Sequence, residues 1–151
     1  DTFVGLAWAL GVTVEVGVMI ATPRLLRRFR AHDIIIFCCI CSIVRWVILS
    51  EATSQISVLA AQPLHGLTFG LWYLAISNWV QKQAPSHLRA TLQSITLSSM
   101  ALGMIFGYQL GGPILETQGG SAVFQAAAIA ASVALVLNTI LRTLPPRPSA
   151  T

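Results

Sequence analysis

The chain has 151 residues, of which 55% are hydrophobic and only 9% are charged, and its formal net charge is +4. A typical soluble domain has about 25% charged residues, so this chain has too few to cover a water-exposed surface, which excludes a soluble globular fold. The basic excess suits anionic lipid headgroups. No basic run is interleaved with aromatic residues, which argues against a nucleic-acid partner.

Five apolar runs follow one another along the chain, and each is long enough to cross a hydrocarbon core of about 30 Å as a helix. Runs of this length predict an all-α, polytopic membrane protein. The predicted transmembrane helices occupy residues 1–144, with spans at 3–22, 34–50, 56–80, 91–113 and 121–143. Pro23 is expected to end the first span. Residues 145–151 are expected to form a proline-rich cytoplasmic tail.

The charged residues between these runs alternate in sign. Cations follow the first, third and fifth runs, namely Arg24, Arg27, Arg28, Arg30, Lys82, Arg89, Arg142 and Arg147. The other two gaps hold Glu51 and Glu116 and no cation. Because cationic loops stay in the cytoplasm, we predict a multi-pass protein of the cell inner membrane that starts outside and ends inside.

The start of the chain bears on whether it is complete. Almost nothing precedes the first run, and the chain begins with Asp1 instead of methionine. We therefore expect a piece of a larger protein, whose upstream half would be the main partner of this chain. A self-contained protein of five spans is the alternative.

Three ionisable residues stand out because they lie well inside the predicted spans: Glu15, Arg45 and His65. Each costs about 2.5–3.5 kcal/mol to insert, so such residues usually mark function. By residue count Arg45 and His65 lie at similar depth in the outer half, and Glu15 lies about 9 Å deeper. A carboxylate that alternates between an unpaired site and Arg45 could carry a proton. The alternatives are a fixed Glu–Arg pair that joins two helices and a structural core histidine.

One face of the third span mixes polar and aromatic side chains around His65. Gln62, Phe69, Trp72 and Ile76 lie within about 60° of His65 at 100° per residue, and Thr68 adjoins them. Such a face suits a cavity for a partly polar organic solute. Alternatively, the aromatic rings face lipid or other helices.

Small residues recur every four positions on the fourth span, at Ser99, Gly103, Gly107 and Gly111. Gly66 and Gly70 repeat the spacing on the third span. This spacing lets another helix approach closely and predicts helix packing.

Motifs of enzymes and cofactor sites are absent from the sequence, which has no HExxH, no GxSxG and no Walker-type lysine. We therefore expect neither an enzyme nor a bound cofactor. Cys38, Cys39 and Cys41 could bind a soft metal, but no partner ligands have suitable spacing, and packing is the favoured role.

Several segments resemble the C-terminal half of a major facilitator superfamily transporter, above all the 3-phenylpropionic acid transporter group, which is related to lactose permease. They are WALGVTVEVGV (8–18), IVRWVIL (43–49) and QPLHGLTFGLWYLA (62–75). APSHLRATLQS (84–94) is similar to the family's inner loop between helices ten and eleven, and RLLRRFR (24–30) to its basic loop between helices eight and nine.

The resemblance implies that the five spans are helices eight to twelve of a twelve-helix transporter that performs proton-driven symport. It places Glu15, Arg45 and His65 at positions similar to the acidic, basic and imidazole residues of lactose permease. Thr68 stands where that permease has a second carboxylate, so Glu15 becomes the leading proton carrier.

We therefore expect part of a proton-coupled symporter for a small organic solute, with an aromatic or other organic acid favoured. Its partners would be the lipid bilayer, the solute, protons and the N-terminal half of the transporter. The alternatives are a membrane scaffold or receptor of the same fold that does not transport, and a drug-efflux antiporter.

Overall fold

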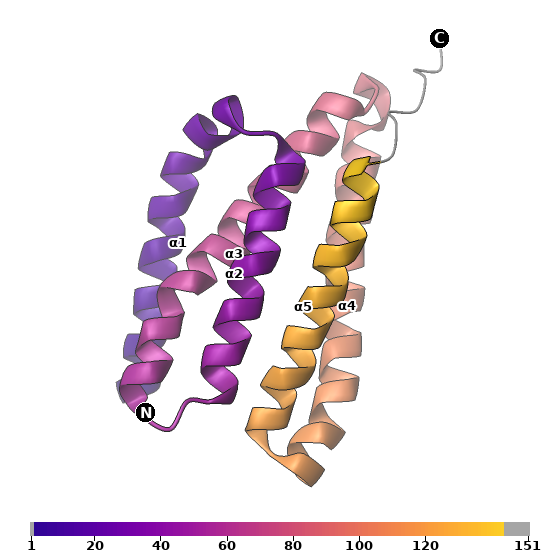
Figure 1. Cartoon of the computed structure of the whole chain (residues 1–151). Coiled ribbons are helices and arrows are strands. Elements are labelled where there is room, and N and C mark those ends of the chain that lie inside the picture. The colour runs from indigo at the N-terminus through magenta and orange to yellow at the C-terminus, as the bar shows by residue number, and fades with distance from the viewer. Residues whose placement is uncertain (1, 144–151) are drawn as a thin grey trace.

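The computed structural model describes residues 2–143, and the predicted tail at 145–151 lies outside them. The described chain is a bundle of five long helices: α1 (Thr2–Arg28), α2 (Ala31–Ser50), α3 (Gln55–Gln83), α4 (Arg89–Gln118) and α5 (Gly120–Thr143), with a short 3₁₀ turn, η1 (Ser86–Leu88), before α4. Figure 1 shows the helices side by side with connections that alternate between the two ends of the bundle. The predicted all-α architecture with five long helices is confirmed.

The first helix extends beyond its predicted end. We expected Pro23 to terminate it, yet α1 continues to Arg28 with Pro23 inside the helix. Proline removes only one backbone N–H, so a helix can continue past it at a cost of about 3 kcal/mol. The hydroxyl of Thr22, which is only 1% exposed, donates to the carbonyl of Val18 at 2.7 Å just before the proline.

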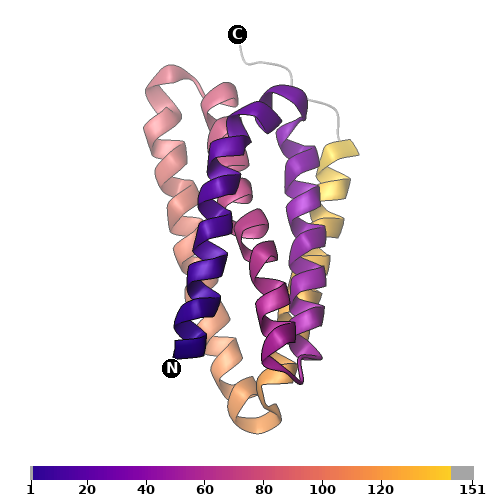
Figure 2. The same cartoon turned by 90° about the vertical axis from the view of Figure 1, so that its left-hand side faces the viewer.

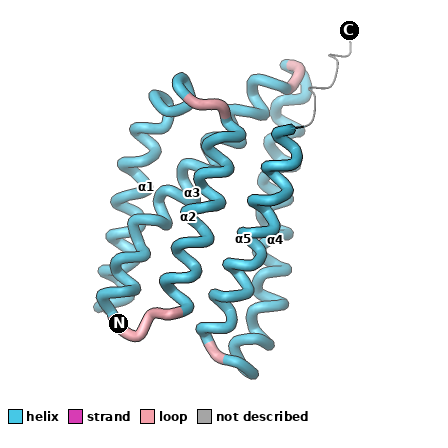
Figure 3. The backbone as a smooth tube through the Cα atoms, viewed as in Figure 1, coloured by secondary structure: helices cyan, strands magenta, loops and turns pink. Residues whose placement is uncertain are grey.

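The connections between the helices are short, as Figure 3 shows. Ser54 precedes α3, and its hydroxyl accepts a hydrogen bond from the N–H of Ser57 at 3.2 Å. Gly119 alone separates α4 from α5, and its φ of 84° lies in the left-handed region that favours glycine. These tight turns fix neighbouring helices antiparallel to one another.

The third helix is the one long helix of residues 2–143 that has no stretch apolar enough to qualify as a candidate membrane span. Four segments are apolar and long enough to cross a membrane: α1, α2, Ser86–Gln118 and α5. The helix α3, predicted as a span at 56–80, is not among them, since it carries residues such as Gln62, His65 and Asn78. It nevertheless runs from one end of the bundle to the other and connects α2 to α4, as the two perpendicular views show (Figures 1 and 2). It packs against α1 and α2, with Ala61 and Ala75 fully buried.

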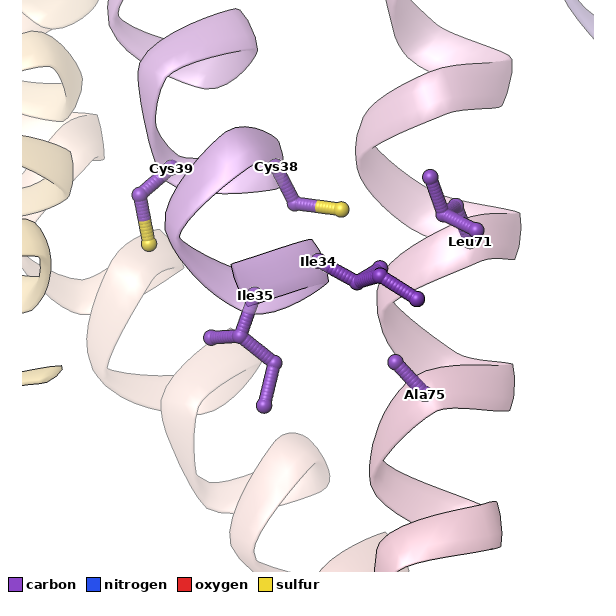
Figure 4. Close-up of a cluster of buried hydrophobic side chains, with 6 residues drawn as sticks. All are labelled: Ile34, Ile35, Cys38, Cys39, Leu71 and Ala75. Carbon is purple, nitrogen blue, oxygen red and sulfur yellow. The ribbon is translucent and has the colours of Figure 1, made fainter. Parts of the chain in front are cut away.

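The hydrophobic core lies between α2 and α3. Its buried side chains are Ile34, Ile35, Cys38, Cys39, Leu71 and Ala75, drawn in Figure 4. The thiol of Cys38 donates to the carbonyl of Leu67 on α3 at 3.3 Å. The cysteines thus act here as small packing residues. Within residues 2–143 no three His, Cys, Asp or Glu side chains are placed so that they could hold one metal ion together.

The two ends of the bundle differ in charge. The end at which α1 and α3 finish carries the cations of the α1–α2 and α3–α4 connections and Arg142. The other end carries Glu51 and Glu116. Across residues 2–143 there is one ion pair, in which Arg142 Nη2 lies 2.8 Å from Asp33 Oδ1 at the basic end. The cationic and anionic gaps of the sequence therefore lie at opposite ends of the bundle.

Candidate functional site

Glycines on α3 allow α1 to approach it very closely. A Cβ atom added to Gly66 would lie 2.6 Å from the backbone nitrogen of Glu15, which is closer than real Cβ atoms come to such an atom. A Cβ atom at Gly70 would lie 3.0 Å from Cγ of Glu15. The small residues therefore place Glu15 against the Gly66–Gly70 face of α3, which lies about 100–140° around the helix from His65.

The outer part of this contact opens into a cavity of about 230 Å³ between α1, α2 and α3. Its polar and aromatic lining comes from Trp8 on α1, Arg45 on α2, and Gln62 and His65 on α3. The other lining side chains are apolar: Phe3, Val4, Ala7 and Val58. The cavity lies toward the end of the bundle opposite the cations, because it is built from the first turns of α1 and α3.

His65 contacts two aromatic rings. The indole of Trp8 meets the imidazole edge to face, with 6.1 Å between ring centroids. The ring of Phe69 stacks on the imidazole at 6.0 Å between centroids, with an interplanar angle of 19°. Gly11 adjoins the same place, since its Cβ position would lie 3.5 Å from Cδ2 of His65. These contacts fix the orientation of the imidazole at the cavity wall.

Arg45 has a fixed position but lacks an anionic partner. Its guanidinium carbon lies 4.4 Å from the ring centroid of Trp46, and that indole stacks on Phe124 of α5 at 5.8 Å. Its Nε is buried and has no hydrogen-bond partner among residues 2–143. Glu15 and Arg45 form no ion pair in the described chain. The cavity thus contains a positive charge with free donors.

The structure separates the side chains that the sequence grouped around His65. Gln62 lines the cavity and Phe69 stacks on the imidazole. The hydroxyl of Thr68 donates to the carbonyl of His65 at 3.0 Å. Trp72 packs against the core cluster that includes Cys38 and Leu71, and neither it nor Thr68 is among the residues lining the cavity.

Trp8 is the site residue that our reading of the sequence missed. It lies three residues before Gly11 and seven before Glu15, so the three share one face of α1. That spacing is a signal that could have placed its indole beside the polar face of α3.

The small-residue stripe on α4 is open within this chain. Cβ atoms at Gly103 and Gly107 would meet no atom within 4 Å, and at Gly111 only Val123 Cγ1 at 3.8 Å. The Ser99 hydroxyl bonds back to the carbonyl of Ile95 at 2.8 Å. No residue of α4 is buried. Gly111 thus makes an ordinary contact with α5, and Gly103 and Gly107 bring no helix close in the described structure.

Comparison with known proteins gives a family and two relatives. The sequence model of the MFS_1 like family matches residues 1–126. In Escherichia coli (strain K12), the protein named "Probable 3-phenylpropionic acid transporter" is 33% identical over 100 residues, which are 66% of this chain and 26% of that protein. The protein named "Putative nucleoside transporter YegT" is 27% identical over 113 residues, which are 71% of this chain and 27% of that protein.

The chain therefore spans 26–27% of the length of these curated relatives. No solved structure matches it.

Proposed function

The chain belongs to the MFS_1 like family of the major facilitator superfamily, and on this premise we propose that it is part of a secondary active transporter. The family resemblance of the sequence is thereby confirmed, and the chain is a multi-pass membrane protein. The proposed activity is proton-coupled symport of a small organic acid by alternating access. In this role the chain binds solute and is not an enzyme.

The observation that carries the proposal is the unpartnered Arg45 in a cavity with an aromatic wall. A guanidinium binds a carboxylate through two parallel hydrogen bonds, and a buried one without an anion is costly. Trp8 and the apolar lining offer a surface for a ring or short hydrocarbon. One relative is named for 3-phenylpropionic acid, which joins a phenyl ring to a carboxylate. The other is named for nucleosides, which lack a carboxylate, so Arg45 favours the acid.

Glu15 is the proposed proton carrier. It lies one turn inward of His65, is partly buried and has no cationic partner in the described chain. A residue in this role must exchange its proton with each side of the membrane in turn, which the proposed alternating access would allow. Arg45 would hold the solute anion, while His65 and Gln62 would contact its polar groups.

The proposed location is the cell inner membrane, with the start of the chain outside and its C-terminus in the cytoplasm. The gathering of cations at one end of the bundle supports this orientation. The cavity then lies in the outer half of the membrane, where solute and proton would enter together during uptake.

The proposed partner is the remainder of the transporter, which would contact this chain along α4. Its relatives are nearly four times as long as the matched segment, so much of the transporter lies outside this chain. The open positions at Gly103 and Gly107 would admit a closely packed helix.

Uptake by the full-length transporter that contains this chain tests the proposal. Labelled 3-phenylpropionate would be offered to membrane vesicles with and without an imposed inward proton gradient. We expect accumulation only with the gradient, and competition by unlabelled acid but not by its neutral amide or by a nucleoside. Extrusion would identify an antiporter, and binding without uptake a receptor. Preferential uptake of a nucleoside would contradict the assigned solute class.

A further inference from the structure

A second pocket lies at the basic end of the bundle, remote from the cavity that Arg45 lines. It has a volume of about 330 Å³ where the end of α1, the start of α2 and the last turn of α3 meet. Arg30 and Lys82 line it, together with His32 and Trp79, whose rings meet edge to face at 6.3 Å. Neither Arg30 nor Lys82 forms an ion pair within residues 2–143. Nδ1 of His32 is buried and has no hydrogen-bond partner there. The pocket therefore presents positive charge and N–H donors without an anion.

An apolar groove of about 480 Å³ adjoins this pocket along the same three helices. It is lined by Leu25, Phe29, Ile34, Phe37, Leu67 and Leu71, and Phe29 lines the basic pocket as well. Phe29 and Phe37 are 50% and 47% exposed, so their rings are open to the surroundings. The carboxylate of Asp33 also borders the groove, but its charge is balanced by Arg142 at 2.8 Å.

The spacing of the two features matches the depth of a lipid leaflet. Leu71 in the groove and Lys82 in the pocket are separated by eleven residues of α3, or about 16 Å at 1.5 Å per residue. Half of a hydrocarbon core is about 15 Å thick. Trp79, 42% exposed beside Lys82, is of the type that gathers at membrane–water interfaces. A ligand that fills both features therefore needs an anionic head and a long apolar tail.

We propose that α1, α2 and α3 form a binding site for an anionic phospholipid. Its phosphate lies between Arg30 and Lys82, with His32 as a further donor, and one acyl chain lies over Phe29 in the apolar groove. Basic pockets between transmembrane helices bind anionic headgroups in this way. The site does not depend on which solute the transporter carries, because it shares no residue with the cavity at Arg45.

Lipid titration of the detergent-solubilised full-length transporter, followed by native mass spectrometry, tests the site. Dioleoylphosphatidylglycerol would be compared with dioleoylphosphatidylcholine, and inorganic phosphate would be tested as a competitor. The variants are R30Q/K82Q, the charge-retaining pair R30K/K82R, and R24Q/R28Q as a matched control. The control removes the same charge from the same end, but its residues line neither the pocket nor the groove.

We expect phosphatidylglycerol to bind at least about 10-fold more tightly than phosphatidylcholine, since each cation near an anionic headgroup contributes about 1 kcal/mol. R30Q/K82Q should lose this preference, whereas R30K/K82R and R24Q/R28Q should keep it. Equal binding of the two lipids, or equal loss in R30Q/K82Q and R24Q/R28Q, would overturn the proposal. Displacement of the lipid by millimolar inorganic phosphate would assign the pocket to free phosphate and would likewise overturn it.

Discussion

Glycines spaced four residues apart occur on both α3 and α4, yet only those on α3 are closely packed against another helix. At Gly66 and Gly70 the backbone and side chain of Glu15 fill the space that a Cβ atom would need. At Gly103 and Gly107 that space is open. The spacing of the glycines thus allows close packing on both helices, but a close contact forms only where a second helix lies against them. We call the contact of Glu15 on α1 with Gly66 and Gly70 on α3 the seam. The cavity opens at its outer end, so the closest helix packing and the candidate site both lie on α1 and α3.

Filling the seam is expected to have the largest effect. Gly66→Leu would drive a side chain into the backbone of Glu15, which cannot move without displacing α1. Overpacking of this kind costs about 1–3 kcal/mol and more where backbone is involved. We expect a large fall in folded protein and no uptake, measured by thermal unfolding and vesicle transport. A well-folded, active Gly66→Leu variant would show that α1 and α3 are not in close contact.

Removing the charge at the outer end of the seam should have the next largest effect. Arg45→Gln removes the proposed ligand of the solute carboxylate and should weaken apparent affinity for 3-phenylpropionate roughly 10- to 100-fold, the value of one charge-assisted hydrogen bond. Arg24→Gln, an exposed change on α1, serves as the control. Unchanged competition by the acid in Arg45→Gln would remove this residue from solute binding.

The open stripe should respond differently from the seam. A Cβ atom at Gly107 would meet no atom within 4 Å in this chain, so Gly107→Leu should not lower the free energy of unfolding by more than about 0.5 kcal/mol, as for most surface positions. If a helix of the remaining transporter packs there, the transport rate should still fall several-fold. Wild-type uptake in this variant would mean that nothing packs closely on Gly107.

The helices could be predicted from the sequence because apolar runs and charged gaps mark them directly. The end of the first could not, since proline disfavours a helix without forbidding one. In α1 the helix continues through Pro23 to Arg28. The location of the cations at one end followed from their places in the sequence.

The site could be predicted only in part. The residues Glu15, Arg45 and His65 stand out because charge and imidazole are rare in such helices, and the structure sets Arg45 and His65 on one cavity. Trp72 shares the helix face of His65 but lies seven residues further, about 10 Å along the axis, where it meets the core on α2. Angular position alone does not give depth. The spacing of small residues in the sequence also does not tell whether another helix packs against them.

The central claim is that the seam positions Glu15 to carry the proton that drives uptake. Glu15→Gln in the full-length transporter tests it most directly, with Glu116→Gln, an exposed change at the α4–α5 turn, as the control. Vesicles would be assayed for gradient-driven accumulation of 3-phenylpropionate and for exchange of labelled against unlabelled solute. We predict that Glu15→Gln loses accumulation but keeps exchange, while Glu116→Gln keeps both. Accumulation by Glu15→Gln at the wild-type level would contradict the account.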